Sequence, residues 1–183
     1  INLNIVERHK CILSPGSGVD LNYFKFRKNK FSKNTKFLLF GRLLKEKGVF
    51  EFIKASKKIY QDKLNCEFKI IGNLDKLNPS SLTKKDIVDY CSYNKNSYQN
   101  FKKDIRKSIY WSNCVVLPSY REGTPRGLLE ALALGRPIIT TNAVGCREVL
   151  KNNKNGFVSE VKSVNSLYEA LKKFHYLNKK KKI

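Results

Sequence analysis

The chain has 183 residues, a length that suits one well-packed α/β domain and is too short for two full ones. Its formal net charge is +22, but lysines are spread along the whole chain, so the charge fits a Lys-rich composition about as well as a surface for anionic partners. No apolar run approaches the roughly 20 residues of a membrane span and no signal peptide opens the chain, so we expect any contact with a membrane to be peripheral.

Apolar runs alternate along the chain with segments of helical periodicity, the pattern of a parallel sheet with helices on both faces. In chain order we predict a strand near 11–13, strand 36–40, helix 47–60, strand 67–71, helix 84–93, strand 97–101, helix 105–111, strand 114–117, helix 125–134, strand 137–140, strand 156–158 and helix 163–174. This order predicts a doubly wound, Rossmann-like α/β domain, which binds ligands outside the carboxyl ends of its strands.

Composition also predicts the organisation of the chain. Residues 22–35 are polar, basic and poor in aliphatic side chains, which is typical of a linker or surface excursion. We therefore expect residues 1–20 to end a preceding domain, 21–35 to form a linker, 36–174 to form the ligand-binding domain and 175–183 to form a basic tail. The chain begins at Ile1 and contains no methionine, which predicts a fragment of a longer protein that has lost its N-terminal part.

The residues that commonly hold metals or close disulfides give little indication of such a site. We assign no role to His9 and His175, which lie near the two ends of the chain. The cysteines are odd in number and form no CxxC pair, so reduced thiols in a cytosol are expected rather than a disulfide framework or a zinc site. They are Cys11, Cys66, Cys91, Cys114 and Cys146. There is also no D-x-D pair to suggest a divalent ion, and no G-x-G-x-x-G or P-loop motif.

Two carboxylates follow the predicted strand 114–117, in the stretch YREGTPRGLLEALALGRP. Glu122 lies directly after the strand, and Glu130 lies in the second turn of an otherwise apolar helix. Thr124 is a suitable N-cap and Pro125 a suitable first helical residue, which leaves the amides of residues 126, 127 and 128 unpaired at a helix N-terminus where a phosphate can bind. The alternative is structural, with Glu122 capping a turn and Glu130 paired with a lysine.

A second candidate stretch, FGRLLKEKGV, follows the predicted strand 36–40. Gly41 permits a sharp turn, and Arg42 and Lys47 can both reach the crevice at the strand ends. Two cations and two helix N-termini could neutralise a diphosphate without a metal ion. For each cation taken alone, a solvated surface charge is the alternative.

Taken together, SPGSGVD, GRLLKEKG, KIIGN, VVLPSYREGTPRGLLEALALGRPIITTNAVGCREV and NGFV resemble the C-terminal, nucleotide-binding domain of the retaining glycosyltransferases of family 4, which have the GT-B fold. The resemblance spans residues 11–174 and is greatest to bacterial enzymes of capsule, O-antigen and lipid-linked glycan synthesis. It implies transfer of a hexose or N-acetylhexosamine from a nucleotide sugar, with UDP the expected nucleotide, to a glycan or lipid-linked acceptor. It further implies that no metal or other cofactor is needed, and that an N-terminal domain missing from this chain supplies the acceptor site.

The same resemblance implies roles for single residues. Arg42 and Lys47 would hold the donor diphosphate and assist departure of the leaving group, Glu122 would bind donor-sugar hydroxyls near the reacting carbon, and Glu130 would bind the ribose hydroxyls. The implied catalytic residues are therefore Glu122, Arg42 and Lys47. The implied donor-binding residues are Gly41, Arg42, Lys47, Gly123, Thr124, Arg126, Gly127, Leu128 and Glu130.

Two other functions remain open from the sequence. One is an inactive remnant that still binds a sugar nucleotide. The other is a basic module that binds nucleic acid or anionic lipid through its charge, although this reading leaves the paired carboxylates unexplained and no specific nucleic acid is expected. For the enzyme, we expect a cytoplasmic location, with peripheral attachment to the anionic inner face of the membrane.

Overall fold

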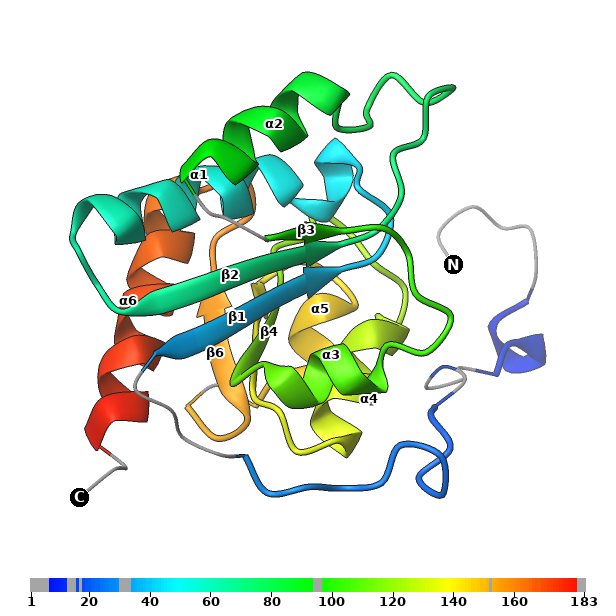
Figure 1. Cartoon of the computed structure of the whole chain (residues 1–183). Helices are drawn as coiled ribbons and strands as arrows, with labels where there is room; N and C mark the ends of the chain where they lie inside the picture. The colour runs from blue at the N-terminus through cyan, green and yellow to red at the C-terminus, as the bar shows by residue number, and fades with distance from the viewer. Residues whose placement is uncertain are drawn as a thin grey trace.

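The computed structural model describes residues 7–12, 16, 18–29, 34–93, 97–151 and 153–180. Its centre is a six-stranded parallel sheet in the order β3-β2-β1-β4-β5-β6 (Figure 1). The strands are β1 Thr35–Phe40, β2 Cys66–Ile71, β3 Tyr98–Gln99, β4 Cys114–Leu117, β5 Ile138–Thr141 and β6 Gly156–Ser159. The strand order reverses between β1 and β4, which pair side by side, so the sheet has a topological switch point at their carboxyl ends.

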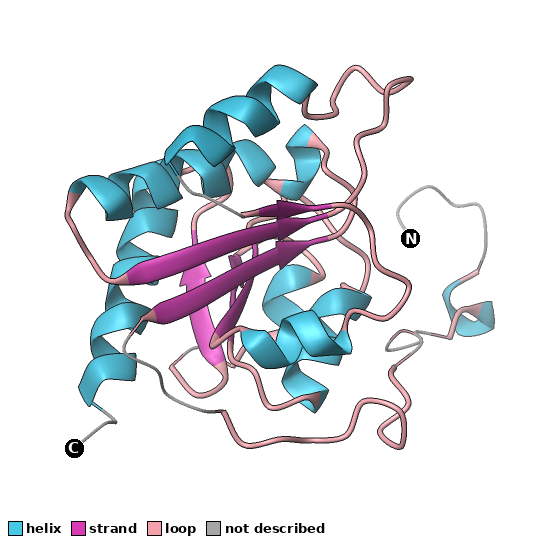
Figure 2. Ribbon diagram, in the orientation of Figure 1, coloured by secondary structure: helices cyan, strands magenta, loops and turns pink. Residues whose placement is uncertain are grey.

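Helices cover both faces of the sheet, in three layers (Figure 2). Alternate residues of β1 explain this arrangement: Phe37 and Leu39 enter one buried cluster, while Leu38 enters the other. The first cluster includes side chains of α1, α2 and α6, and the second includes side chains of α3 and α4. The helices are α1 Val49–Gln61, α2 Lys84–Tyr93, α3 Arg106–Trp111, α4 Arg126–Ala133, α5 Cys146–Val149 and α6 Val164–Lys180, with 3₁₀ turns η1 Arg8–Lys10 and η2 Lys45–Lys47. The doubly wound, Rossmann-like fold predicted from the sequence is confirmed.

Some predicted boundaries are wrong. The strand near 11–13 is absent at Cys11 and Ile12, which follow η1, and residue 13 lies outside the described residues. The predicted strand at 97–101 is reduced to the two residues of β3, and the short helix α5 was not predicted.

The C-terminal segment also differs from the prediction of a basic tail that begins at residue 175. Helix α6 continues to Lys180, and the side chains of His175 and Asn178 are buried. The reason is helical spacing: Leu171, Phe174, His175 and Asn178 follow the i, i+3, i+4, i+7 pattern and share the buried face. The positions between them are more exposed and are occupied by Lys172, Lys173, Tyr176 and Leu177. The last turns of α6 therefore belong to the domain.

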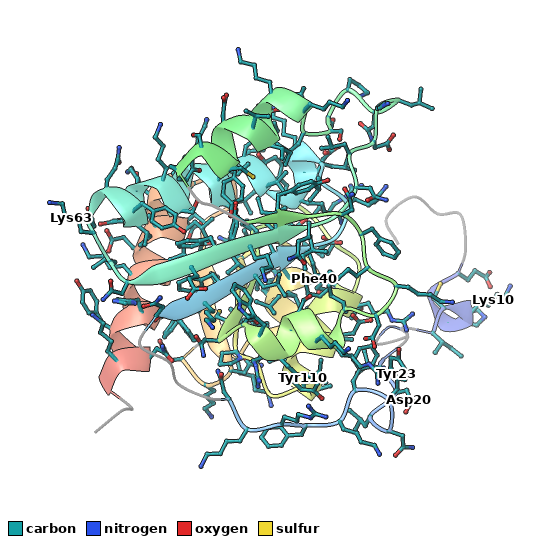
Figure 3. All side chains as sticks on the ribbon, in the orientation of Figure 1. Lys10, Asp20, Tyr23, Phe40, Lys63 and Tyr110 are labelled. Atoms are coloured by element: carbon teal, nitrogen blue, oxygen red, sulfur yellow. The ribbon has the colours of Figure 1, made fainter. Side chains whose placement is uncertain are left out.

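The predicted linker packs against the domain over the part that the structure describes. Phe24 is buried in the cluster beneath α3 and α4. The hydroxyl of Tyr110 in α3 donates to the carbonyl of Lys25 at 2.5 Å, and the Arg27 guanidinium lies 4.5 Å from the centre of the Tyr110 ring. Figure 3 shows Tyr23 and Tyr110 on the side of the molecule where this segment passes α3. The segment thus packs on the surface of the domain beside α3.

Within the described residues, no helix has both the length and the apolar character that a membrane crossing requires.

Candidate functional site

A cavity of about 290 Å³ opens at the switch point, between the carboxyl ends of β1 and β4. It brings together residues that are far apart in the sequence. The segment after β1 contributes Gly41, Arg42 and Lys47, the loop after β4 and the first turns of α4 contribute residues in the range 122–130, and the ends of β1 and β4 contribute apolar side chains. Of the predicted donor-binding and catalytic residues, the cavity is lined by Gly41, Arg42, Lys47, Glu122, Arg126, Gly127 and Glu130. Gly123, Thr124 and Leu128 were also predicted but are not among its lining residues.

The two predicted charge groups meet directly in this cavity. The Nζ atom of Lys47 lies 2.6 Å from Oε1 of Glu122, and these side chains are only 21% and 13% exposed. Such a short, largely shielded contact is a charge-assisted hydrogen bond. Lys47 therefore presents a cation to the cavity while it holds one oxygen of Glu122 in a fixed position.

The loops that carry Lys47 and Glu122 are attached to one another by their backbones. The carbonyl of Glu46 accepts hydrogen bonds from the Ser119 hydroxyl at 2.9 Å and from the Tyr120 amide at 2.8 Å. The buried Thr141 hydroxyl donates to the Ser119 carbonyl at 2.5 Å, which ties the same loop to β5. Three neighbouring strand ends thus set the distance between the cation and the carboxylate.

The beginning of α4 differs from the predicted capping pattern. Pro125 occupies the N-cap position with ψ 95°, no side chain caps the helix, and the first helical residue is Arg126. The extended ψ of Pro125 places the start of the helix one residue later than predicted. The Leu128 amide is also not free, because it donates to the Pro125 carbonyl at 2.9 Å, and its side chain is fully buried in the core.

Two amides in this turn remain available to a ligand. The amides of Arg126 and Gly127 donate to no backbone carbonyl of a described residue, as expected for the first residues of a helix. Both residues line the cavity, where the positive end of the helix dipole favours an anion.

Glu130 is held in a different environment from Glu122. Its Oε1 atom lies 3.2 Å from Nε of Arg126, one turn earlier in α4, and its side chain is 13% exposed whereas that of Arg126 is 67% exposed. Burial raises the pKa of the Glu130 carboxyl, and the Arg126 charge partly opposes this rise. The sequence-based alternative of a structural ion pair is therefore met in part, with an arginine as partner, but the pair faces a cavity rather than bulk protein.

A larger cavity of about 500 Å³ adjoins the first and shares Phe40, Gly41, Arg126 and Glu130 with it. Its remaining wall comes from the segment before β1, from the last residue of β2 and from the loop between β3 and α3. These residues are Asp20, Tyr23, Phe24, Ile71, Phe101, Lys102, Lys103, Asp104 and Ile105. Figure 3 shows Asp20 and Tyr23 on this side of the molecule, beyond Phe40 at the end of β1.

Arg106 fastens the wall of the larger cavity. Its guanidinium pairs with Asp104 at 2.7 Å, donates to the Tyr23 carbonyl at 3.2 Å and stacks 3.8 Å from the centre of the Tyr23 ring. The hydrogen bonds from Arg106 lower the pKa of Asp104 to about 2. Sequence reasoning missed this wall because it assigned the segment around Tyr23 to a linker. The alternation of Phe24 and Phe26 with Lys25 and Arg27 was the available signal.

The fold and this two-part cavity define a doubly wound α/β domain with a cavity at the carboxyl ends of its strands, where such domains bind ligands. A family model described as glycosyl transferases group 1 matches residues 22–182, so the chain belongs to that family. The domain matches the C-terminal domain of GT-B glycosyltransferases in fold.

Individual relatives agree with this assignment. N,N'-diacetylbacillosaminyl-diphospho-undecaprenol alpha-1,3-N-acetylgalactosaminyltransferase of Campylobacter jejuni is 29% identical over 93% of this chain and 46% of its own length. The C-terminal domain of the group 1 glycosyl transferase LpcC from Francisella tularensis superposes with a TM-score of 0.72, at 24% identity, over 86% of this chain and 87% of that one. Anabaena HepE in complex with UDP has a TM-score of 0.71 at 20% identity, over 85% of this chain and 45% of that one. The chain spans about half the length of the curated relatives it matches first.

Proposed function

We propose that this chain is the donor-binding domain of a metal-independent, retaining glycosyltransferase of family 4 that uses a UDP-sugar. The observation that carries the proposal is the pair of adjoining cavities, with two cations at one end and Glu130 at their junction. A nucleoside diphosphate sugar suits this arrangement, because its charged diphosphate can lie beside the cations of the smaller cavity while its nucleoside extends past Glu130 into the larger one. A structural neighbour was determined with UDP bound, which supports the choice of nucleotide.

The diphosphate fits the smaller cavity. Arg42, Lys47 and the amides of Arg126 and Gly127 supply positive charge or unpaired donors there. These groups can offset the negative charge of a diphosphate and the charge that builds up as it departs. Metal independence is part of this proposal and is supported by those cations.

The two carboxylates accept hydrogen bonds from hydroxyl groups. We place the donor sugar beside Glu122, near the cations, and the ribose beside Glu130, which faces both cavities. The base then occupies the larger cavity, between Phe40 and the loop that carries Phe101. Ligand hydroxyls would provide further partners for a carboxylate as shielded as Glu130, which among the described residues pairs with Arg126.

Retention is proposed from the stereochemistry of the related reaction. The Campylobacter jejuni relative is named for an alpha-1,3 linkage, and UDP-activated hexosamines carry the sugar in α linkage, so such a transfer keeps the configuration. In this chain the cations at the leaving phosphate would stabilise developing charge on the face from which UDP departs.

The acceptor and the location are proposed from the same relative, whose name includes a lipid diphosphate. We propose a hexose or N-acetylhexosamine as the transferred sugar, and a glycan or lipid-linked acceptor on the cytoplasmic side of a membrane. A second GT-B domain would complete the acceptor site. An inactive remnant that binds UDP-sugars is the second candidate, favoured if the complete protein binds its donor without turnover.

Calorimetry on three variants tests the donor site. Glu130→Gln should weaken UDP and UDP-sugar alike by about 1.5 to 3 kcal/mol, the value of a hydrogen bond to a charged group, and should leave inorganic diphosphate nearly unchanged. Arg42→Ala should weaken all three ligands, because it removes charge from the diphosphate. Glu122→Gln should weaken UDP-sugar more than UDP.

Neighbouring exposed residues provide matched controls. Lys45→Ala and Glu46→Gln change charge beside the site, at side chains that do not line the cavity, and should leave all affinities within error. If Glu130→Gln leaves every nucleotide affinity intact in a folded protein, the carboxylate is structural and the proposed donor site is incorrect.

A further inference from the structure

One face of the sheet is left partly open along β2, the strand next to the edge strand β3. Alternation places Cys66, Phe68 and Ile70 of β2 in the core with α1 and α2, so Glu67 and Lys69 point to the opposite face. The described helices on that face, α3 and α4, pack over β1, β4 and β5, and none of them crosses β2 in Figures 1 and 2. Leu38 and Ile71 are buried on this face, whereas Lys36, Glu67 and Lys69 are half-buried.

Cations gather around an aromatic ring on this open face. The Nζ atom of Lys69 lies 3.8 Å from the centre of the Trp111 ring, and that of Lys36 lies 5.5 Å from it. Within the described ranges neither lysine forms an ion pair. The nearest acid by strand register is Glu67, opposite Lys36, and it accepts a hydrogen bond from Asn34.

The lysines of this cluster repel one another. Partial burial lowers the pKa of Lys69, and the charges of Lys102 and Lys36 lower it further, with Glu67 opposing them. An anion that binds between like charges at close range offsets their repulsion. The open face, defined by Lys36, Lys69 and Trp111, thus has unmet positive charge next to an amphipathic ring.

We propose that this open face is a docking surface for a membrane that contains anionic phospholipids. The shape favours that occupant: two half-buried lysines of the sheet lie beside one ring, Trp111 at the end of α3, whereas single-stranded nucleic acid is bound in grooves with successive aromatic platforms. An indole beside lysine side chains suits the lipid headgroup region, where tryptophan and basic residues concentrate. A second copy of this chain is disfavoured by its own charge of +22.

The inference extends the proposed membrane location, and its test does not depend on the donor site. Trp111 is the single tryptophan of the chain, so its emission reports on the open face alone. With vesicles of phosphatidylcholine and phosphatidylglycerol we expect its emission to shift to the blue and to be quenched by brominated lipid. With pure phosphatidylcholine we expect neither change.

Charge variants show whether the open face or the overall charge of the protein is responsible for binding to anionic vesicles. Lys36→Gln/Lys69→Gln should reduce partitioning onto the anionic vesicles by about 30-fold, the effect of two lysines near the surface. Lys84→Gln/Lys85→Gln removes the same charge from exposed positions on α2, across the sheet, and should have a much smaller effect. Lys36→Arg/Lys69→Arg should restore binding, which separates loss of charge from loss of folding.

Three results would overturn the proposal. The first is an equal loss in the α2 control, which would show that net charge alone attracts the vesicles. The second is sedimentation with vesicles while Trp111 emission stays unchanged. The third is a response of Trp111 to duplex DNA but not to vesicles, which would assign the face to nucleic acid. UDP affinity measured on the same variants should stay unchanged, so that failure here is distinct from failure of the donor site.

Discussion

His175 shows how burial sets the chemistry of a single side chain in this protein. Its ring is fully buried in α6, where Nδ1 lies 2.9 Å from the Thr35 hydroxyl and 3.3 Å from the Cys66 sulfur. The Asn178 amide donates to the same Thr35 oxygen at 3.0 Å, which leaves the Thr35 proton for Nδ1. Burial and the charge of Lys179 lower the pKa of His175. The folded state therefore holds this imidazole neutral where the unfolded chain would protonate it.

This difference predicts a loss of stability in mild acid. Below about pH 6.5, the ordinary pKa of histidine, the unfolded state binds a proton that folded His175 takes up only at lower pH. The free energy of unfolding should therefore fall as the pH falls from 7.5 to 5.5, by at most about 1.4 kcal/mol per pH unit from this group. Urea titrations at several pH values measure this slope.

The variant His175→Gln isolates the contribution of the histidine. It lacks a titrating ring, so its unfolding free energy should vary less with pH over the same interval, whatever its stability at pH 7.5. The pKa of the Glu130 carboxyl is raised in the folded state, so this group increases the free energy of unfolding as the pH falls, opposite to the effect of His175. This contribution is present in both proteins. Identical slopes in the two proteins would show that other groups cause the pH dependence.

Between elements, the important feature is the close contact of η2 with the loop after β4. Gly48 follows Lys47 with φ +70°, and a Cβ atom at this position would overlap the Pro118 carbonyl oxygen. The absence of a side chain thus permits the close approach that places Lys47 against Glu122. Glycine here serves the geometry of the site as well as the turn.

Gly48→Ala should therefore separate the two loops. Gly18 is a matched control, because it has a similar φ of +64° but a Cβ atom at that position would meet nothing within 4 Å. Both substitutions introduce backbone strain of about 1 to 2 kcal/mol, and Gly48→Ala should add about 1 to 3 kcal/mol for overpacking. Urea unfolding measures this difference, and calorimetry should show weaker UDP-sugar binding for Gly48→Ala only. Equal effects would mean that the contact with Pro118 is readily relieved.

At the scale of the whole molecule, the sequence predicts the sheet and the ligand edge well. Apolar strands followed at once by Arg42 or Glu122 are local patterns, and parallel topology brings such strand ends to one edge. Contacts between distant segments are less predictable. No local pattern indicates that Lys47 pairs with Glu122, that Tyr23 lies under Arg106, or that α6 buries His175 among lysines, because each depends on which surfaces meet after folding.

The ligand proposed for the two cavities would join both halves of the sheet, since its contacts come from the β1 side and the β4 side of the switch point. Such a ligand binds only the folded state and should stabilise the whole domain. At 100 times the dissociation constant, the gain is about 2.7 kcal/mol, which corresponds to a rise in Tm of about 5 to 10 °C for a domain of this size. Because Arg42 and Lys47 can provide the positive charge, UDP should produce this rise equally in EDTA and in magnesium. Arg42→Ala should diminish it in both buffers, while Lys45→Ala should not. A rise that appears only with magnesium would show that a metal ion, rather than these side chains, neutralises the diphosphate.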